Sequence, residues 1–411
     1  MLIILLGISG VEIKDVSLNE EGELIIRVKS MIKGANCPKC GRRLHKICHS
    51  DYEVKLRHLS VLGYETYIVI APQRYKCEHC NNQPTTTQRM DWYEQKHPCT
   101  NAYEEYLLLS LINSTIQDVS VQENIGYDVI DGILDRKVST KIDWGEINKI
   151  DYLGIDEISI KKGHRDFVVI VTAFIAGKLR ILGVLENRAK ATVKQFFMSI
   201  PKRLRKTITA VCSDLYVGFI TAAKEVFGKR IRIVADRFHV AKLYREGLDK
   251  LRKKEMRRLK KVLSEQEYKK LKNVLWILRK SPDELTDQEL KTLKLLFRYS
   301  RDLKIAYELC LDLTNIFDMK INQGSAKRKI GGWIRRVRNS GLSCFDTFIN
   351  TILKWMREIT NYFVDRLNSG FVEGVNNKIK VIKRRCYGIT NIKNLFQRIR
   401  LDLEGYQKLP V

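Results

Sequence analysis

The chain has 411 residues, 44% of them hydrophobic, and a formal net charge of +27. That hydrophobic share excludes a disordered chain, and the length predicts about two to four domains. So large a basic surplus indicates a polyanionic partner, most often nucleic acid, ahead of a ribosomal-type or membrane-surface protein.

The first residues, 1–8, are apolar but too few to span a bilayer, and we predict no signal peptide and no transmembrane helix. We therefore expect an intracellular protein, in which ten cysteines indicate metal binding rather than disulfides. Residues 1 to about 90 have the composition of strands and turns, with strand-forming runs at 23–28 and 64–70.

Two Cys-x-x-Cys pairs lie in this β-rich region, and they are Cys37 with Cys40 and Cys77 with Cys80. A spacing of two residues allows both thiols to bind one ion through a tight turn, and two such pairs complete a tetrahedral Zn²⁺ site. Other candidate ligands lie nearby, namely His45, Cys48, His49, His79 and Cys99. Because four thiols already complete a site, we predict a structural zinc ribbon over unrelated buried thiols.

Helical periodicity replaces the strand pattern after residue 100. Three helices are predicted, at 103–112, 116–125 and 127–138. Gly126 separates the last two, as in a helix-turn-helix, although short helices joined at a glycine also occur in packed bundles. If this segment binds DNA, residues 127–137 would enter the major groove, where their three aspartates make them poor phosphate ligands.

Residues 150–240 alternate between strand and helix patterns. Strands are predicted at 151–160, 167–175, 178–185, 207–212 and 231–235, and helices at 192–204 and 217–227. Turn signals at 162–164 and 176–177 separate the first three strands. This order predicts a mixed sheet covered by helices.

Residues 240–360 hold almost no strand signal and are predicted to form a helical insertion. A charged helix is expected at 250–261, with breaks at Pro282 and at Gly331-Gly332. From residue 369 onward the pattern predicts one or two basic helices.

Acidic residues end three of the predicted strands. Asp156 and Glu157 follow the apolar run 152–155 of the first, Asp214 follows the fourth and Asp236 follows the fifth. One such acid is often a cap or turn residue, but ligand sites of open α/β sheets gather at strand ends. Carboxylates brought together there repel unless a cation lies between them, and Mg²⁺ suits such oxygen-rich sites.

The helix after Gly370 carries a lone acid. Its expected buried stripe consists of Val372, Val375, Ile379 and Ile382. Glu373 borders that stripe, so it is predicted to face the sheet rather than to be a surface counter-charge. Asn377 lies one turn further on, followed by Lys380 and Arg384, which offer an amide and then phosphate contacts.

Three sequence blocks resemble those of bacterial insertion-sequence transposases of the ISL-three family. They are Gly154-Ile-Asp-Glu-Ile-Ser-Ile-Lys-Lys-Gly-His164, Ala235-Asp-Arg-Phe-His-Val240 and Asn368-Ser-Gly-Phe-Val-Glu-Gly-Val-Asn-Asn-Lys-Ile-Lys380, the last continued by Arg385-Cys-Tyr-Gly388. The cysteine ribbon, the helix-turn-helix and the helical insertion follow the same order, so the resemblance covers nearly the whole chain.

The resemblance implies an α/β fold: an RNase H-like mixed sheet flanked by helices, with a large all-α insertion, an N-terminal zinc ribbon and a helix-turn-helix. It also implies a DDE triad that binds two catalytic Mg²⁺ ions, with Mn²⁺ as a substitute. The first acid would be Asp156 and the last Glu373. In such a sheet the fourth strand lies beside the first, about 4.8 Å away, and the fifth lies beyond it. This favours Asp214 as the middle acid and holds Asp236 in reserve.

Auxiliary roles follow for Asp236, His239 and Asn377. Glu157 is expected to point to the opposite face of the sheet. Contacts to DNA phosphates are expected along 250–261 and 378–400, and the residues singled out are Lys253, Arg257, Lys378, Lys380, Lys383, Arg384 and Arg385. Trp333 is predicted to be a core residue, in preference to stacking on an unpaired base.

As a transposase, the protein would bind the terminal inverted repeats, cut double-stranded DNA and join its 3′ ends to target DNA, as a homodimer on DNA. It would be cytoplasmic and nucleoid-associated in a bacterium, with no membrane partner. The alternatives are a non-catalytic DNA-binding regulator and an RNase H-like nuclease or resolvase without strand transfer. The expected domains are 1–95 (zinc ribbon), 96–148 (helix-turn-helix), 149–240 (catalytic core), 241–362 (helical insertion) and 363–411 (final catalytic helix and basic segment).

Overall fold

The structure is a computed structural model that describes residues 6–161, 165–367 and 370–409, with side chains described except at 160–161, 165–166 and 370–373. Two compact units divide the chain. The first contains residues 1–140, 385–387 and 397–411, and the second contains residues 141–384 and 388–396. The predicted turn at 162–164 lies outside the described residues.

A four-stranded sheet begins the first unit. Its order is β1 (Val11–Leu18), β2 (Leu24–Ser30), β7 (Tyr64–Ile70) and β6 (Val54–Val61). The strands predicted at 23–28 and 64–70 are confirmed as β2 and β7, which pair in parallel. Their apolar side chains form one small core with Leu56, Met90 and Trp92.

Short strands carry the cysteine pairs. They are β3 (Ala35–Asn36), β4 (Arg43–Leu44), β5 (Ile47–Ser50), β8 (Gln73–Lys76) and β9 (Thr85–Thr87). β3 pairs with β4 around the first cysteine pair, and β8 pairs with β9 around the second. Each pair therefore lies at the tip of a hairpin.

Three short helices follow, as predicted: α1 (Asn101–Leu111), α2 (Ile116–Gln122) and α3 (Tyr127–Lys137). Thr100 and Thr115 cap α1 and α2 by accepting backbone N–H groups. The residues of α16 (Ile392–Lys408) from Gln397 onward belong to the same unit, and Leu401 joins the three-helix core.

Arg398 of α16 is 2% exposed and donates to the backbone carbonyls of Leu111 and Ser114 at 2.9 and 2.6 Å. The prediction that Arg398 contacts a DNA phosphate is therefore wrong. The guanidinium instead satisfies carbonyls at the end of α1 that have no partner within the helix.

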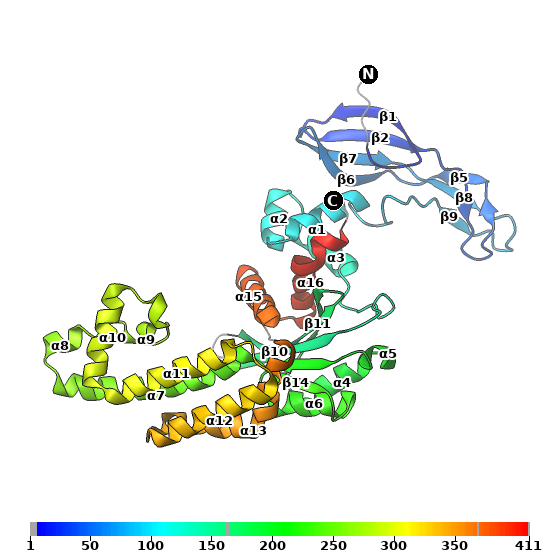
Figure 1. Ribbon diagram of the computed structural model, residues 1–411. Helices are drawn as coiled ribbons and strands as arrows, with labels where there is room; N and C mark the ends of the chain where they lie inside the picture. Colours follow the sequence, from blue (N-terminus) through cyan, green and yellow to red (C-terminus); the bar gives the residue numbers. More distant parts are fainter. Residues whose placement is uncertain (1–5, 162–164, 368–369, 410–411) are drawn as a thin grey trace. The chain divides into compact units, whose positions relative to one another are not determined.

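The second unit contains the predicted mixed sheet (Figure 1). Its order is β12 (Lys178–Leu185), β11 (Arg165–Ile175), β10 (Tyr152–Lys161), β13 (Ala210–Ser213) and β14 (Arg232–Ala235). The first three strands are antiparallel, whereas β13 and β14 run parallel to β10. The first strand thus lies beside the fourth, with the fifth beyond it, as expected for an RNase H-like sheet.

One face of this sheet is covered by α4 (Lys190–Ser199) and α6 (Val217–Phe227), whose apolar side chains share a core with Leu153, Ile155 and Val211. The prediction of a single helix at 192–204 is wrong at its C-terminal end. Pro201 separates α4 from α5 (Lys202–Arg205), because proline has no N–H to continue the helical ladder.

The segment after β14 is helical throughout its described length, as predicted. It contains α7 (Arg237–Val262), α8 (Glu265–Lys269), α9 (Val274–Ile277), η1 (Pro282–Glu284), α10 (Asp287–Tyr299), α11 (Arg301–Asp318), α12 (Gln323–Asn339), η2 (Ser343–Phe345), α13 (Asp346–Thr360) and α14 (Tyr362–Asp365). Figure 1 shows α7 and α11 running side by side away from the sheet toward α8, α9 and α10. The last helix of this unit is α15 (Gly370–Arg385).

The predicted break at Gly331-Gly332 is wrong, because α12 continues through both residues. A helical glycine costs roughly 1 kcal/mol relative to alanine. Here Ile330, Trp333 and Ile334 are buried on either side of the pair, and their packing offsets that cost. Trp333 is fully buried, and its Nε1 donates to the carbonyl of Leu309 at 2.7 Å, which confirms it as a core residue.

Among the described residues, no helix combines the length and the apolar character needed to cross a membrane.

Candidate zinc centre and active site

The four thiols of the two Cys-x-x-Cys pairs converge on one point. Their Sγ atoms all lie within 4.8 Å of one another. Cys37 and Cys80 are separated by 4.0 Å, and Cys40 and Cys77 by 3.8 Å. Zn–S bonds of about 2.3 Å place tetrahedral sulfurs about 3.8 Å apart, so these residues fit a structural zinc ion.

The backbone turns explain why the thiols meet. Gly41 adopts a left-handed φ of 71°, and its N–H donates to the carbonyl of Cys37 at 2.9 Å. In the second turn, the N–H of Gln83 donates to the carbonyl of Cys80 at 2.9 Å. The nearby His45, Cys48, His49, His79 and Cys99 lie outside the thiol cluster, whose members are the four predicted cysteines.

Replacing Cys37 and Cys40 together by serine should abolish zinc binding, because two thiols cannot complete the site. Metal analysis of the purified chain should give about one zinc per chain for the wild type and none for this variant. Cys48→Ser is the matched control, since Cys48 is exposed and outside the cluster. Stoichiometric zinc in the double variant would contradict the ribbon assignment.

The predicted strand-end acids lie in register across three neighbouring strands. Ile155 of β10 pairs with Ser213 of β13, and Ser213 pairs with Ala235 of β14. The next positions are Asp156, Asp214 and Asp236. Asp214 and Asp236 directly follow β13 and β14, whereas Asp156 lies within β10, so the prediction that it ends a strand is wrong. Successive residues of a strand point to opposite faces, so these acids lie on the face opposite the α4–α6 core that contains Ile155.

Charge and burial act on these carboxyl groups together. Burial raises the pKa of Asp156 to about 6, and the nearby charges of Asp236 and Asp214 add to the shift. Burial also raises the pKa of Asp214, with further contributions from the charges of Glu157 and Asp236, while His239 opposes the rise. A group of partly buried acids that favours protonation without a cation is the arrangement expected of a divalent-metal site.

Asp214 and Asp236 differ in what their oxygens already bind. Asp236 is 6% exposed and caps α7: one oxygen accepts the N–H of Phe238 at 2.8 Å, and the other contacts His239 Nδ1 at 2.7 Å. Asp214 accepts the N–H of Tyr216 at 3.2 Å through one oxygen. Its second oxygen has no hydrogen-bond partner among the described residues.

Glu157 lies on the other side of the strand. Both of its oxygens lie 3.4 Å from Nη1 of Arg188. Its carboxylate is therefore paired with a cation on that side, although its charge still contributes to the raised pKa of Asp214.

Among the described side chains, Asn376 and Lys383 bind helix α15 to β10. Asn376 is 4% exposed, and its Nδ2 donates to Oδ2 of Asp156. Lys383 donates to the carbonyl of Ser159 at 2.7 Å. Three of the four predicted stripe residues are buried, namely Val375, Ile379 and Ile382. Val372 and Glu373 also lie on α15, but their side chains are outside the described part of the chain.

Sequence reasoning proposed Asn377 as the amide on this face, yet Asn377 is exposed and the amide that reaches Asp156 belongs to Asn376. The burial of Val375 and Ile379 places Asn376 on the inner side of the helix, between two turns of the apolar stripe. The oxygen of this amide, Oδ1, is buried without a hydrogen-bond partner in the described structure.

The basic residues singled out from the sequence fall into two groups. Lys383 bonds a strand carbonyl, and Arg385 pairs with the buried carboxylate of Asp402, so both hold the fold together. The exposed members are Lys253, Arg257, Lys380 and Arg384, and Lys378 is partly exposed. Sequence reasoning missed a further basic surface on α12, where Lys327, Arg328, Lys329, Arg335 and Arg338 are exposed.

Fold and site together define a zinc-ribbon protein with an acid-lined RNase H-like core. The model of a transposase family, ISL3, matches residues 153–399, which is more than half of the chain. A second model, described as the zinc-finger of transposase IS204/IS1001/IS1096/IS1165, matches residues 33–80. The chain therefore belongs to the ISL3 family of insertion-sequence transposases.

Two relatives are similar over nearly their full lengths. The transposase for insertion sequence element IS1001 of Bordetella parapertussis is 26% identical over 383 residues, which cover 93% of this chain and 92% of the relative. The transposase for insertion sequence element IS1557 of Mycobacterium tuberculosis is 22% identical over 426 residues, which cover 97% and 93%. The family prediction is confirmed.

Asp156→Asn should stabilise the zinc-loaded chain in Mg²⁺-free buffer at neutral pH. The pKa of Asp156 in the folded chain lies above its ordinary value, so folding is most favourable below that value and loses stability as pH rises toward 6. The variant should gain several degrees in Tm at pH 7.5, with the gain vanishing near pH 4. Glu146→Gln, at an exposed acid, is the control. An equal gain at both pH values would contradict this account.

Proposed function

We propose that this chain cuts the 3′ ends of its insertion sequence and joins them to target DNA by metal-dependent phosphoryl transfer. The observation that carries this proposal is the position of Asp156 and Asp214, each directly after the last paired residue, Ile155 or Ser213, of the adjacent parallel strands β10 and β13. Neighbouring strands lie about 4.8 Å apart, so both carboxylates can share one cation. Family membership supports the same reaction class.

Three residues would hold divalent metal, which we take to be Mg²⁺: Asp156, Asp214 and Glu373. When bound, such ions stabilise the attacking and the leaving oxygen of an in-line displacement. Glu373 precedes Asn376 by three positions on α15, and residues three apart in a helix share one face. The contact between Asn376 and Asp156 therefore supports placing Glu373 with the two aspartates.

Asp214 is the better candidate for the middle acid. Asp236 already caps α7 and bonds His239, so using it as a ligand would break contacts that hold the start of this helix. Asp214 keeps one oxygen available among the described residues. We assign Asp236 and His239 to positioning at the strand ends.

The remaining chain would hold DNA. Exposed cations on α7, α12 and α15 would neutralise phosphates without reading sequence. The zinc ribbon and α1–α3 would recognise the terminal inverted repeats. On α3, Arg136 and Lys137 lie 2.7 and 3.4 Å from the buried carboxylate of Glu104. Because these two cations are used within the fold, we expect the rest of α3 to contact bases rather than phosphates. A homodimer would pair the two ends.

Strand transfer on a labelled duplex that carries the element's terminal repeat tests the triad. In Mg²⁺ the wild type should join 3′ ends, and Asp214→Asn and Glu373→Gln should each lower the rate at least about 100-fold, since each removes a metal ligand. Glu146→Gln should be as active as the wild type.

Three results would overturn parts of this proposal. Wild-type rates in Asp214→Asn, together with loss of joining in Asp236→Asn, would move the middle position to Asp236. Cleavage without joining by the wild type would indicate a nuclease or resolvase. Repeat binding without cleavage would indicate a regulator.

Asn376→Ala should raise the Mn²⁺ concentration needed for half-maximal activity about 10- to 100-fold, because Asp156 loses the donor that orients it. Asn377 is the exposed neighbouring residue, so Asn377→Ala is the control and should leave the Mn²⁺ dependence unchanged. Repeat binding without metal should be the same in both variants. An unchanged Mn²⁺ dependence in Asn376→Ala would show that the contact has no part in holding metal.

A further inference from the structure

A pocket of about 320 Å³ opens along α7, beside the strand-end acids. Its first lining residue, Phe238, donates its backbone N–H to Asp236 at the end of β14. The pocket continues along α7 to Arg252, and its other wall is formed by Leu275, Leu278 and Arg279 in and after α9. Its volume lies in the range of roughly 300–1,000 Å³ that is usual for small-ligand sites.

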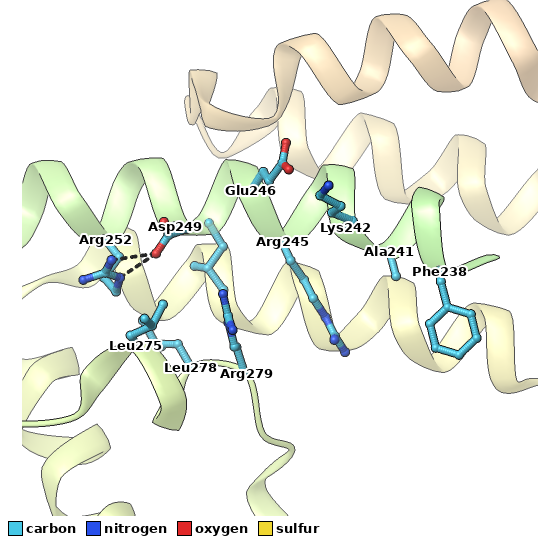
Figure 2. Close-up of a pocket in the computed structure, with 11 residues that line it drawn as sticks. Phe238, Ala241, Lys242, Arg245, Glu246, Asp249, Arg252, Leu275, Leu278 and Arg279 are labelled. Atoms are coloured by element: carbon cyan, nitrogen blue, oxygen red, sulfur yellow. Dashed lines mark hydrogen bonds and ion pairs between the residues drawn. The ribbon is translucent and has the colours of Figure 1, made fainter. Parts of the chain in front are cut away.

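The spacing of residues on α7 creates this pocket. Phe238, Ala241, Arg245 and Leu248 follow one another at intervals of three and four residues, so they share one face of the helix. Ala241 is the small residue of this stripe, and it leaves room between the phenyl ring and the guanidinium. Figure 2 shows Phe238 at one end, Arg245 reaching down from α7 and Arg279 reaching up from the opposite wall.

Among the described residues, three of the four cations that line the pocket form no ion pair. Asp249 pairs with Arg252 at 2.7 Å, which accounts for one acid and one base of the lining. Lys242, Arg245 and Arg279 form no ion pair with any described acid, and Arg279 lies over the ring of Trp276. Glu246 projects to the other side of the α7 ribbon in Figure 2. An excess of unpaired positive charge around an apolar depression is complementary to a ligand that carries both a flat apolar group and an anion.

Phe238 supplies the flat apolar surface. Its side chain is exposed, with a residue exposure of 51%, although most aromatic residues of this unit are buried in its cores. An exposed ring beside cations is the arrangement on which proteins stack single-stranded bases. A base within a duplex has both faces covered by its neighbours, so it reaches such a ring only after leaving the stack.

We propose that this pocket binds one unpaired nucleotide of a DNA strand, with its base stacked on Phe238 and its phosphate held by Arg245 and Arg279. This inference rests on the proposed function, since it places the nucleotide next to the strand-end acids. It assigns the beginning of α7 a role in holding DNA that is distorted at the cleavage site.

The test compares two fluorescently labelled duplexes of one sequence, one fully paired and one with a single bulged 2-aminopurine nucleotide. Binding is measured by anisotropy in Mg²⁺-free buffer, so that no bond has to be broken. The wild type should bind the bulged duplex about 10-fold more tightly and quench its 2-aminopurine fluorescence, because each stacked base contributes substantially to binding.

Two kinds of variant separate the pocket from general DNA affinity. Ala241→Leu fills the pocket and Phe238→Leu removes the ring, and both should abolish the preference while leaving affinity for the paired duplex unchanged. Ala241→Ser and Phe238→Trp are the matched controls that should retain it. Arg245→Ala and Arg279→Ala should weaken binding of the bulged duplex more than that of the paired duplex.

Equal affinity of the wild type for the two duplexes would overturn the proposal and leave the pocket to another class of ligand. So would a preference that survives Ala241→Leu. If the arginine variants weaken both duplexes equally, the pocket binds only duplex phosphates, and the proposal also fails. None of these outcomes depends on strand transfer, so failure of the pocket and failure of the proposed reaction are distinguishable.

Discussion

The burial of carboxyl groups beside one another, at Asp156 within β10 and at Asp214 and Asp236 after β13 and β14, is the constraint around which the second unit is arranged. Burial and neighbouring charge raise the pKa of Asp156 and Asp214, so the fold holds these acids in a state that favours either protonation or a cation. The sheet tolerates these partly buried acids because its other face is stabilised by the apolar core that it forms with α4 and α6. Asp156 is thereby fixed within a strand, and Asp214 and Asp236 are fixed directly after one, which suits a site that must present metal in one geometry.

The acids differ in the contacts that their carboxylates make. Asp236 is committed to α7, since it caps the helix and bonds His239, and Asp156 is oriented by Asn376 from α15. Helix α7 begins at Arg237 and α15 begins at Gly370, far apart in the chain, yet both helices contact these neighbouring acids. The helices between α7 and α15 also support this edge of the sheet, since α13 packs on β14 and Asn361 donates to the carbonyl of Ile233 at 2.7 Å.

Basic residues illustrate why charge alone is a poor guide to nucleic-acid contacts. The net charge of +27 indicates a polyanionic partner, yet Arg385 and Arg398 are used inside the protein, one on a buried carboxylate and the other on helix carbonyls. Both occur in the same basic run as the exposed Lys380 and Arg384. The distinction depends on which side of a helix faces the core, so a count of lysines and arginines does not reveal it.

The sequence by itself determined the order of elements, the four zinc-site cysteines and the positions of Asp214 and Asp236 after their strands, because turn residues, Cys-x-x-Cys spacing and apolar periodicity are local signals. It could not show that α12 runs through Gly331-Gly332, since the packing that offsets two glycines comes from distant residues. Only the tertiary structure decided that Asn376, rather than Asn377, reaches Asp156, and that Ala241 opens a pocket between Phe238 and Arg245. Adjacent positions on a helix differ by about 100° in direction, and what each one meets depends on elements far away in the chain.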